Sequence, residues 1–181
     1  MFEPPLPPAG LTLRPACRDD LPAINDIYNH YVLHSTCTYQ VAPSTMAERE
    51  AWWLERTPQH PVRVLVEADG TVIGWSSLSA FKTREAYART VENSIYVRHD
   101  RLGRGLGRLL LHDQLAEAQR LGHHAVLAVI CSSQAPSIRL HEAFGFTHAG
   151  LLREVGYKFG RWLDIVLMQR LLPVSPPGIR S

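Results

Sequence analysis

The residues of this 181-residue chain that are best suited to chemistry lie between Thr90 and Leu121. An apolar run is followed there by a turn in which glycines alternate with larger residues: Leu102, Gly103, Arg104, Gly105, Leu106 and Gly107. A ligand can approach the backbone closely where side chains are absent, and a helix start offers unpaired N–H groups and partial positive charge. Arginines add charge to the same turn: Arg98, Arg101, Arg104 and Arg108. This pattern indicates a site for phosphate groups, although a flexible, glycine-rich helix start has the same spacing.

A carboxylate and a histidine are candidates for proton transfer. Glu92 lies in the run TVENSIYV, whose alternation predicts a strand with two different faces. Unless a bulge reassigns the later residues, one face carries Val91, Asn93, Ile95 and Val97, and the other carries Thr90, Glu92, Ser94 and Tyr96. A glutamate in a strand is most often solvated, so its position alone assigns no role. His141 lies one helical turn after Ser137 and should face the same way.

About six or seven strands in a mixed sheet and about four helices are predicted to position these residues. Helical periodicity covers Leu21–Val32, Ser44–Arg56, Leu106–Leu121 and Ser137–Phe144. Strands are predicted in LTLRPA, on both sides of an Asp69–Gly70 turn, in TVENSIYV and HAVLAVI, and around a Lys158–Gly160 turn. TVENSIYV and HAVLAVI flank a helix, so they should be parallel neighbours. The sequence predicts one α/β (α+β) domain over residues 11–172, with flexible ends at residues 1–10 and 173–181.

Composition argues against several classes of partner. The net charge is +2 without a long basic block, which favours a local anion site over nucleic-acid binding. No stretch approaches the roughly 18 consecutive apolar residues that span a membrane. Three cysteines without ligand spacing suggest reduced thiols in a cytoplasmic protein. His30 and His34 lie four residues apart but lack a third ligand in helical register, so no metal is expected.

The order of these motifs resembles that of a known family. RLGRGLGRLL after one strand and SIRLHEAFGF after the next resemble the GNAT superfamily of acyl-CoA-dependent N-acyltransferases, whose QxxGxG-type turn binds the pyrophosphate of coenzyme A. Leu102 stands where that family usually carries Gln or Arg. TVENSIYV, SIRLHEAFGF and VGYKFGRWLDIVLMQ further resemble the phosphinothricin N-acetyltransferase group, which includes acetyltransferases of methionine sulfoximine and methionine sulfone. The resemblance covers about Leu11 to Leu172.

This resemblance implies that acetyl-CoA is the co-substrate and that the amine of a small amino acid attacks it directly. Glu92 would be the general base, and His141 would be an acid, a second base or a packing residue. A backbone N–H of the strand would stabilise the thioester oxygen. The coenzyme would contact residues of the strand, the glycine turn and the following helix: Ile95, Tyr96, Val97, Leu102, Gly103, Arg104, Gly105, Leu106, Gly107, Arg108, Gln134 and Ser137. Gln134 stands where the group tends to have Asn.

The acceptor amino acid is expected in the loop before the catalytic strand. Its carboxylate could pair with a cation there, and the predicted contacts are Lys82, Thr83, Arg84, Glu92, Asn93 and Ser94. Tyr28, Tyr31 and Phe81 are further candidates for the pocket. The group is typically dimeric, so a homodimer is expected, in which Lys158, Phe159 and Arg161 could reach the partner's pocket.

Other interpretations of the sequence remain open at this point. The same fold could acetylate a protein N-terminus, a lysine or a polyamine, or it could bind acyl-CoA without catalysis. A nucleotide hydrolase is disfavoured because no Gly-Lys-Ser/Thr follows the glycines.

Overall fold

A seven-stranded sheet forms the centre of the computed structural model, which describes residues 7–173. Its strands lie in the order β1 (Leu11–Pro15), β2 (Val62–Glu67), β3 (Val72–Ala80), β4 (Thr90–Val97), β5 (Ala125–Cys131), β7 (Arg161–Leu171) and β6 (Thr147–Lys158). The helices are α1 (Leu21–His34), α2 (Met46–Leu54), α3 (Leu106–Arg120) and α4 (Ala135–Ala143). The mixed sheet and its helices confirm the predicted fold class.

The predicted flexible ends fall mostly on residues 1–6 and 174–181, which lie outside the described residues. The boundaries of the predicted domain therefore stay a prediction, although the sheet itself begins at Leu11 and ends at Leu171. None of the helices from residue 7 to residue 173 is both long enough and apolar enough to cross a membrane.

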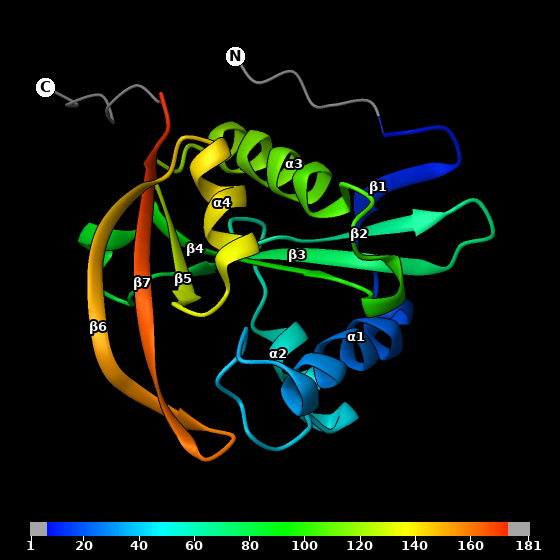
Figure 1. Ribbon diagram of the computed structural model, residues 1–181. Coiled ribbons are helices and arrows are strands. Elements are labelled where there is room, and N and C mark those ends of the chain that lie inside the picture. The colour runs from blue at the N-terminus through cyan, green and yellow to red at the C-terminus, as the bar shows by residue number, and fades with distance from the viewer. Residues whose placement is uncertain (1–6, 174–181) are drawn as a thin grey trace, which may run out of the picture.

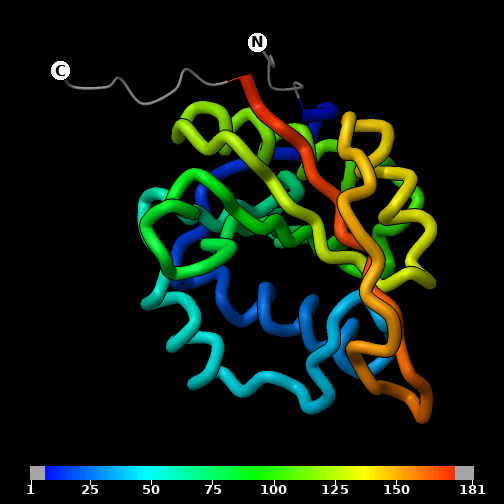
Figure 2. The backbone as a smooth tube through the Cα atoms, turned by 90° about the vertical axis from the view of Figure 1, so that its left-hand side faces the viewer, coloured from blue at the N-terminus to red at the C-terminus, as the bar shows by residue number. Residues whose placement is uncertain are grey.

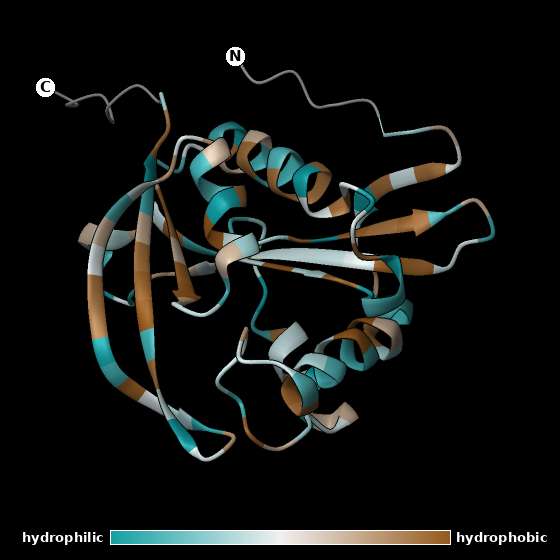
Figure 3. Cartoon of the chain, in the orientation of Figure 1, coloured by the Kyte–Doolittle hydropathy of each residue, from teal (hydrophilic) through white to brown (hydrophobic). Residues whose placement is uncertain are grey.

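Helices cover both faces of the sheet, with α3 and α4 on one side and α1 and α2 on the other (Figures 1 and 2). The α3 side holds a core of Leu78, Val91, Leu111, Leu115, Val126 and Met168. The α1 side holds a second core of Leu21, Ile24, Ile27, Val64, Val66 and Trp75. Because both faces are covered, β5 is apolar along nearly its whole length (Figure 3).

The parallel neighbours β4 and β5 pair over only the first part of their lengths. Their pairing joins Thr90 to Ala125, Val91 to Val126 and Glu92 to Leu127, and ends there. β4 continues to Val97, paired with β3 on its other side, and β5 continues to Cys131, paired with β7. The two strands therefore separate beyond Glu92 and leave a gap within the sheet.

The alternation predicted for β4 is confirmed. The register between β3 and β4 runs without a break, so no bulge reassigns the later residues. Val91 and Val97 are buried in the cores on the α3 side, whereas Tyr96 packs against the α1 core. Glu92 therefore lies on the α1 face of the sheet, and its neighbour Asn93 lies on the α3 and α4 face.

The β6–β7 hairpin reaches the segment between α1 and α2 (Figure 1). The buried ammonium of Lys158 donates to the carbonyl of Ser35 at 2.7 Å and to that of Thr38 at 2.8 Å. Tyr39 lies against Gly156, where an added Cβ would be 2.2 Å from the Tyr39 ring. These contacts hold residues 35–39 against the sheet. They also use the Lys158 side chain within its own chain, so the predicted reach of Lys158 into a partner's pocket does not fit.

Candidate active site

A cavity of about 560 Å³ occupies the gap between β4 and β5. It is lined by many of the residues predicted from the sequence: Glu92, Asn93, Ser94, Ile95, Tyr96, Val97, Leu102, Gly107, Gln134, Ser137 and His141. Lys82, Thr83 and Arg84 are exposed and do not line it. The structure thus brings together the strand, the glycine turn and α4, and leaves the predicted acceptor loop outside this cavity.

The backbone of β4 presents free hydrogen-bonding groups to the cavity. The Arg98 N–H bonds the Ile73 carbonyl at 2.8 Å, and the Thr90 carbonyl accepts from the Phe81 N–H at 3.3 Å. Even-numbered residues of β4 therefore direct their backbone groups to β3, as alternation in an antiparallel pair requires. The odd-numbered residues after Glu92 face the gap. The pairing of Glu92 with Leu127 still engages the Asn93 N–H, and the Val97 carbonyl accepts from the Tyr31 hydroxyl, so the groups left facing the gap are the Asn93 carbonyl, both backbone groups of Ile95 and the Val97 N–H. Tyr96, also predicted as a coenzyme contact, lines the cavity with its side chain.

The glycine turn leads directly into α3 at one end of the cavity. Gly103 and Gly105 have φ angles of +76° and +75°, which only glycine adopts readily. Gly105 is the residue before the helix, and its carbonyl accepts the N–H groups of Arg108 and Leu109. The N–H groups at the very start of α3, before that of Arg108, have no acceptor within the helix. The start of α3 therefore suits an anion.

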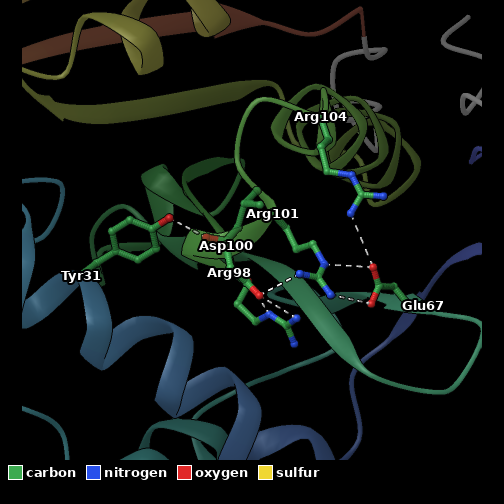
Figure 4. Close-up of polar contacts among 7 residues, drawn as sticks. Tyr31, Glu67, Arg98, Asp100, Arg101 and Arg104 are labelled. Carbon is green, nitrogen blue, oxygen red and sulfur yellow. Dashed lines mark hydrogen bonds and ion pairs between the residues drawn. The ribbon is translucent and has the colours of Figure 1, made fainter.

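The arginines of the turn are partly neutralised by carboxylates (Figure 4). Arg101 lies 3.1 Å from Glu67 and 2.8 Å from Asp100, and Arg98 lies 2.7 Å from Asp100. Arg104 is 3.6 Å from Glu67, and Arg108 lies over the Phe144 ring. Of the four arginines predicted to meet phosphates, Arg98 and Arg101 are therefore the ones tied most closely to the protein itself. The ion pairs of Arg101 and Arg104 with Glu67 fasten the turn to the end of β2.

Glu92 has the environment of a proton acceptor. It lies on β4 where the pairing with β5 ends, and its cross-strand neighbour in β3 is Ser79. Burial raises the pKa of the Glu92 carboxyl above its ordinary value because desolvation disfavours the charged form. A carboxylate with a raised pKa holds an abstracted proton more readily than an exposed one.

His141 is buried and uses both ring nitrogens within the protein. Nδ1 lies 2.8 Å from the Ser137 carbonyl, which can only accept, so Nδ1 carries the proton. Nε2 lies 3.0 Å from the Asn93 side-chain nitrogen and accepts its N–H. Burial lowers the pKa of His141, which favours this neutral form. His141 thus holds Asn93 in place on the α4 face of β4, while Glu92 lies on the opposite face.

Several residues that line the cavity escaped sequence-based reasoning because they come from the segment after α1. Cys37, Thr38 and Tyr39 lie along it, and Thr36 accepts a hydrogen bond from the Gln134 amide at 2.9 Å. That bond uses one amide N–H of Gln134, a residue predicted to contact the coenzyme. The segment carries no motif, and its contacts with Lys158, Asp164 and Gln134 hold it at the site.

Two of the aromatic candidates line cavities, and one does not. The Tyr31 hydroxyl donates to the Val97 carbonyl at 2.5 Å, and burial raises the pKa of Tyr31 to about 12, so it stays protonated. Tyr28 lines a second cavity on the α1 side of the sheet, whereas Phe81 lines neither.

Within residues 7–173, no group of three or more side chains is arranged to hold a metal ion.

Comparison with known proteins assigns this arrangement to a family. The family model of the acetyltransferase (GNAT) domain matches residues 13–167 of the chain. The chain belongs to the GNAT acetyltransferase family. This finding confirms the predicted family and enzyme class.

Relatives within the GNAT family are similar over nearly the whole chain. The L-methionine sulfoximine/L-methionine sulfone acetyltransferase of Pseudomonas aeruginosa is 41% identical over 159 residues, covering 87% of this chain and 92% of the relative. The phosphinothricin N-acetyltransferase of Streptomyces coelicolor is 39% identical over 170 residues, covering 91% and 98%.

A solved relative extends this likeness to three dimensions. A GNAT superfamily phosphinothricin acetyltransferase from Sinorhizobium meliloti, determined in complex with acetyl-CoA, superimposes with a TM-score of 0.89 at 37% identity. The match covers 94% of this chain and 95% of that one. The complex agrees with acetyl-CoA as the predicted co-substrate of the enzyme.

Proposed function

We propose that this enzyme acetylates the amine of a small amino acid or analogue of the phosphinothricin, methionine sulfoximine or methionine sulfone type. The observation that carries the proposal is the cavity between β4 and β5, because one continuous space contacts the glycine turn, the free backbone edge of β4 and Glu92. Relatives of about 40% identity are named for these acceptors.

In the proposed reaction, the glycine turn and the start of α3 bind the pyrophosphate of the co-substrate. The pantetheine arm then lies along the backbone of Asn93, Ile95 and Val97, and the donor to the thioester oxygen is one of the N–H groups beyond the end of the β4–β5 pairing, that of Ile95 or Val97. Acetyl-CoA supplies the thioester carbonyl that the acceptor attacks. Glu92 removes a proton from the acceptor ammonium, directly or through a water molecule, so that the neutral nitrogen attacks. As the C–N bond forms and the C–S bond breaks, coenzyme A leaves as a thiolate and takes up the second proton that the nitrogen loses.

His141 acts in this proposal as a positioning residue. Its Nδ1 proton is held by the Ser137 carbonyl and its Nε2 lone pair by Asn93, so neither nitrogen offers a proton to a leaving thiolate. By fixing Asn93, it keeps the free edge of β4 in place.

Measurement of thiol release from acetyl-CoA tests the proposal. The panel should contain free amino acids, methionine sulfone, methionine sulfoximine, phosphinothricin, peptides and polyamines. We expect saturable turnover with the small amino-acid analogues, and turnover confined to peptides or polyamines would overturn the acceptor assignment.

The Glu92→Gln variant should lower kcat about 10²-fold or more while retaining acetyl-CoA binding, because loss of a general base has this magnitude. The kcat/KM of the wild-type enzyme should rise with pH through the raised pKa of Glu92, and this step should vanish in the variant. An unchanged kcat would remove Glu92 from the mechanism.

We further propose that the enzyme is a cytoplasmic homodimer. β6 is the last strand of the sheet and exposes apolar residues along its length and at the hairpin: Leu151, Leu152, Val155, Tyr157, Phe159 and Trp162. Such an apolar surface on an edge strand fits an interface with a second copy of the chain. The free thiols of Cys17, Cys37 and Cys131 agree with a reducing compartment.

A further inference from the structure

An arginine is buried beside the proposed reaction site without a carboxylate to neutralise it. Arg49 is the buried residue of α2, with 4% of its surface exposed. Charged side chains are rarely buried to this extent unless they are paired. Within residues 7–173, no ion pair involves Arg49. The nearby carboxylate of Glu48 accepts the N–H and hydroxyl of Thr45 instead.

The protein holds the Arg49 guanidinium by one nitrogen and by aromatic faces. Nε donates to Asn25 Oδ1 at 3.1 Å, and the Asn25 amide in turn donates to the Ser44 carbonyl at 2.9 Å. The guanidinium carbon lies 4.7 Å from the ring centroid of Tyr28 and 4.8 Å from that of Trp52. Aromatic faces attract the cation but accept no strong hydrogen bond. Among residues 7–173, the two terminal nitrogens have no hydrogen-bond partner, so they are left to bind a ligand.

Arg49 lines a second cavity, of about 460 Å³, on the α1 side of the sheet. Its wall includes Ser77, Ser79 and Ser94. Ser94 also lines the larger cavity between β4 and β5, and Ser79 is the cross-strand neighbour of Glu92. The Arg49 cavity therefore adjoins the proposed reaction site on the same face of β4 as Glu92.

We propose that Arg49 binds the carboxylate of the acceptor amino acid in this cavity. The assignment rests on the proposed function and specifies its acceptor site. The two terminal nitrogens of a guanidinium can donate parallel hydrogen bonds to a carboxylate, and the buried setting makes such bonds strong. Lys82 and Arg84, the cations predicted for this role, are exposed and line neither cavity.

The test compares an acid with its amide. The kcat/KM of the wild-type enzyme and of Arg49→Met is measured with L-methionine sulfone and with its α-carboxamide. We expect Arg49→Met to lower the value for the acid about 100-fold, as expected for loss of two charge-assisted hydrogen bonds, and the value for the amide less than about 3-fold. Arg49→Lys is a more conservative variant because it keeps the positive charge. It should lower kcat/KM for the acid about 10-fold and leave kcat/KM for the amide unchanged.

Arg18→Met is the matched control. It removes an exposed arginine that also contacts α2, through its ion pair with Glu50. It should change both values less than about 2-fold. Equal losses for acid and amide in both Arg49 variants would assign Arg49 to packing and overturn the proposal. The proposal would also be overturned if Lys82→Ala or Arg84→Ala abolished the preference for the acid while Arg49→Met kept it.

The wild-type enzyme separates this proposal from the proposed function. Failure to acetylate any free amino acid would overturn both. Turnover of free amino acids with an unchanged acid-to-amide ratio in Arg49→Met would overturn the Arg49 assignment alone.

Discussion

Glu92 and His141 show how position on a strand or helix decides what a titratable side chain can do. Both contact the same cavity, but burial moves their pKa values in opposite directions, up for the carboxyl and down for the imidazole. Each shift favours the neutral form. A neutral histidine with two occupied nitrogens is a fixed structural group, whereas a carboxylate with a raised pKa is suited to receive a proton.

The burial of Glu92 should lower the stability of the enzyme at neutral pH. Its folded pKa lies above the ordinary value of 4.5, so its contribution to stability is present below that value and is lost as pH rises through the folded pKa. Glu92→Gln should therefore raise Tm at pH 7, by roughly 2–4 °C for each kcal/mol gained in the free energy of unfolding. The same variant should lower activity. Thermal unfolding followed by circular dichroism measures the change.

The gain in Tm should shrink below about pH 4.5, where Glu92 is protonated in both folded and unfolded chains. Glu85→Gln, which changes an exposed carboxylate, should leave Tm unaltered at both pH values. A lower Tm in Glu92→Gln at pH 7 would mean that the charged carboxylate stabilises the fold.

The place of Glu92 at the cavity could be predicted from the sequence, because the alternation that positions it is local and the TVE run carries a family resemblance. The place of Arg49 beside the site could not be predicted. Its stretch, MAEREAWWL, has the composition of a solvated helix, and the rings that surround the guanidinium come from α1 and β3 as well. The spacing of Arg49 to Trp52, which places both on one face of α2, was the local signal available.

At the scale of elements, the glycine turn combines a backbone requirement with a functional one. Gly103 and Gly105 have positive φ angles, yet nothing lies within 4 Å of where their Cβ atoms would be. Their identity is therefore required by the conformation that leads into α3 and not by crowding.

We expect Gly105→Ala to raise the KM for acetyl-CoA roughly 5-fold, because a non-glycine residue in the left-handed region costs about 1 kcal/mol and shifts the N–H groups of the turn. Steady-state kinetics with varied acetyl-CoA measures the effect. Gly70→Ala is the matched control, since Gly70 also has a positive φ and open surroundings but lies in the β2–β3 hairpin. Equal changes in KM for the two variants would contradict a binding role for the turn.

Most elements were predictable because their signals lie within short stretches. The helix expected over Leu106–Leu121 is observed as α3 from Leu106 to Arg120, and the parallel pairing of β4 with β5 follows from a general rule of handedness. The end of that pairing at Glu92 was not predictable. The space between the strands is lined by α4 and residues 37–39, which come from distant parts of the chain.

At the scale of the whole molecule, β4 separates two adjoining cavities, one proposed for the co-substrate and one for the acceptor. Ser94 and Tyr96 line both. The β6–β7 hairpin holds Tyr39 in the wall of the larger cavity. The Tyr39 ring packs against Gly156, and its hydroxyl donates to the Asp164 carbonyl at 3.0 Å.

The proposed homodimer should depend on the apolar residues of this hairpin. Trp162 is 61% exposed, and Trp162→Glu should convert a dimer into monomers, because an unpaired charge would be buried at the interface. Size-exclusion chromatography with light scattering measures the change. Leu54→Glu, at an exposed apolar position of α2, should remain dimeric. A monomeric wild-type chain at micromolar concentration would contradict the interface.

The separation of β4 from β5 also bears on aggregation. An unpaired strand edge is a template on which foreign chains can add, and most proteins keep such edges short, charged or covered. Here the unpaired stretch of β4 lies inside the sheet, between side chains of α4 on one side and residues 37–39 on the other. A second polypeptide strand with its own side chains would not fit there, whereas a narrow linear ligand with amide groups would. The enzyme can therefore expose a strand edge for recognition without exposing it to other proteins.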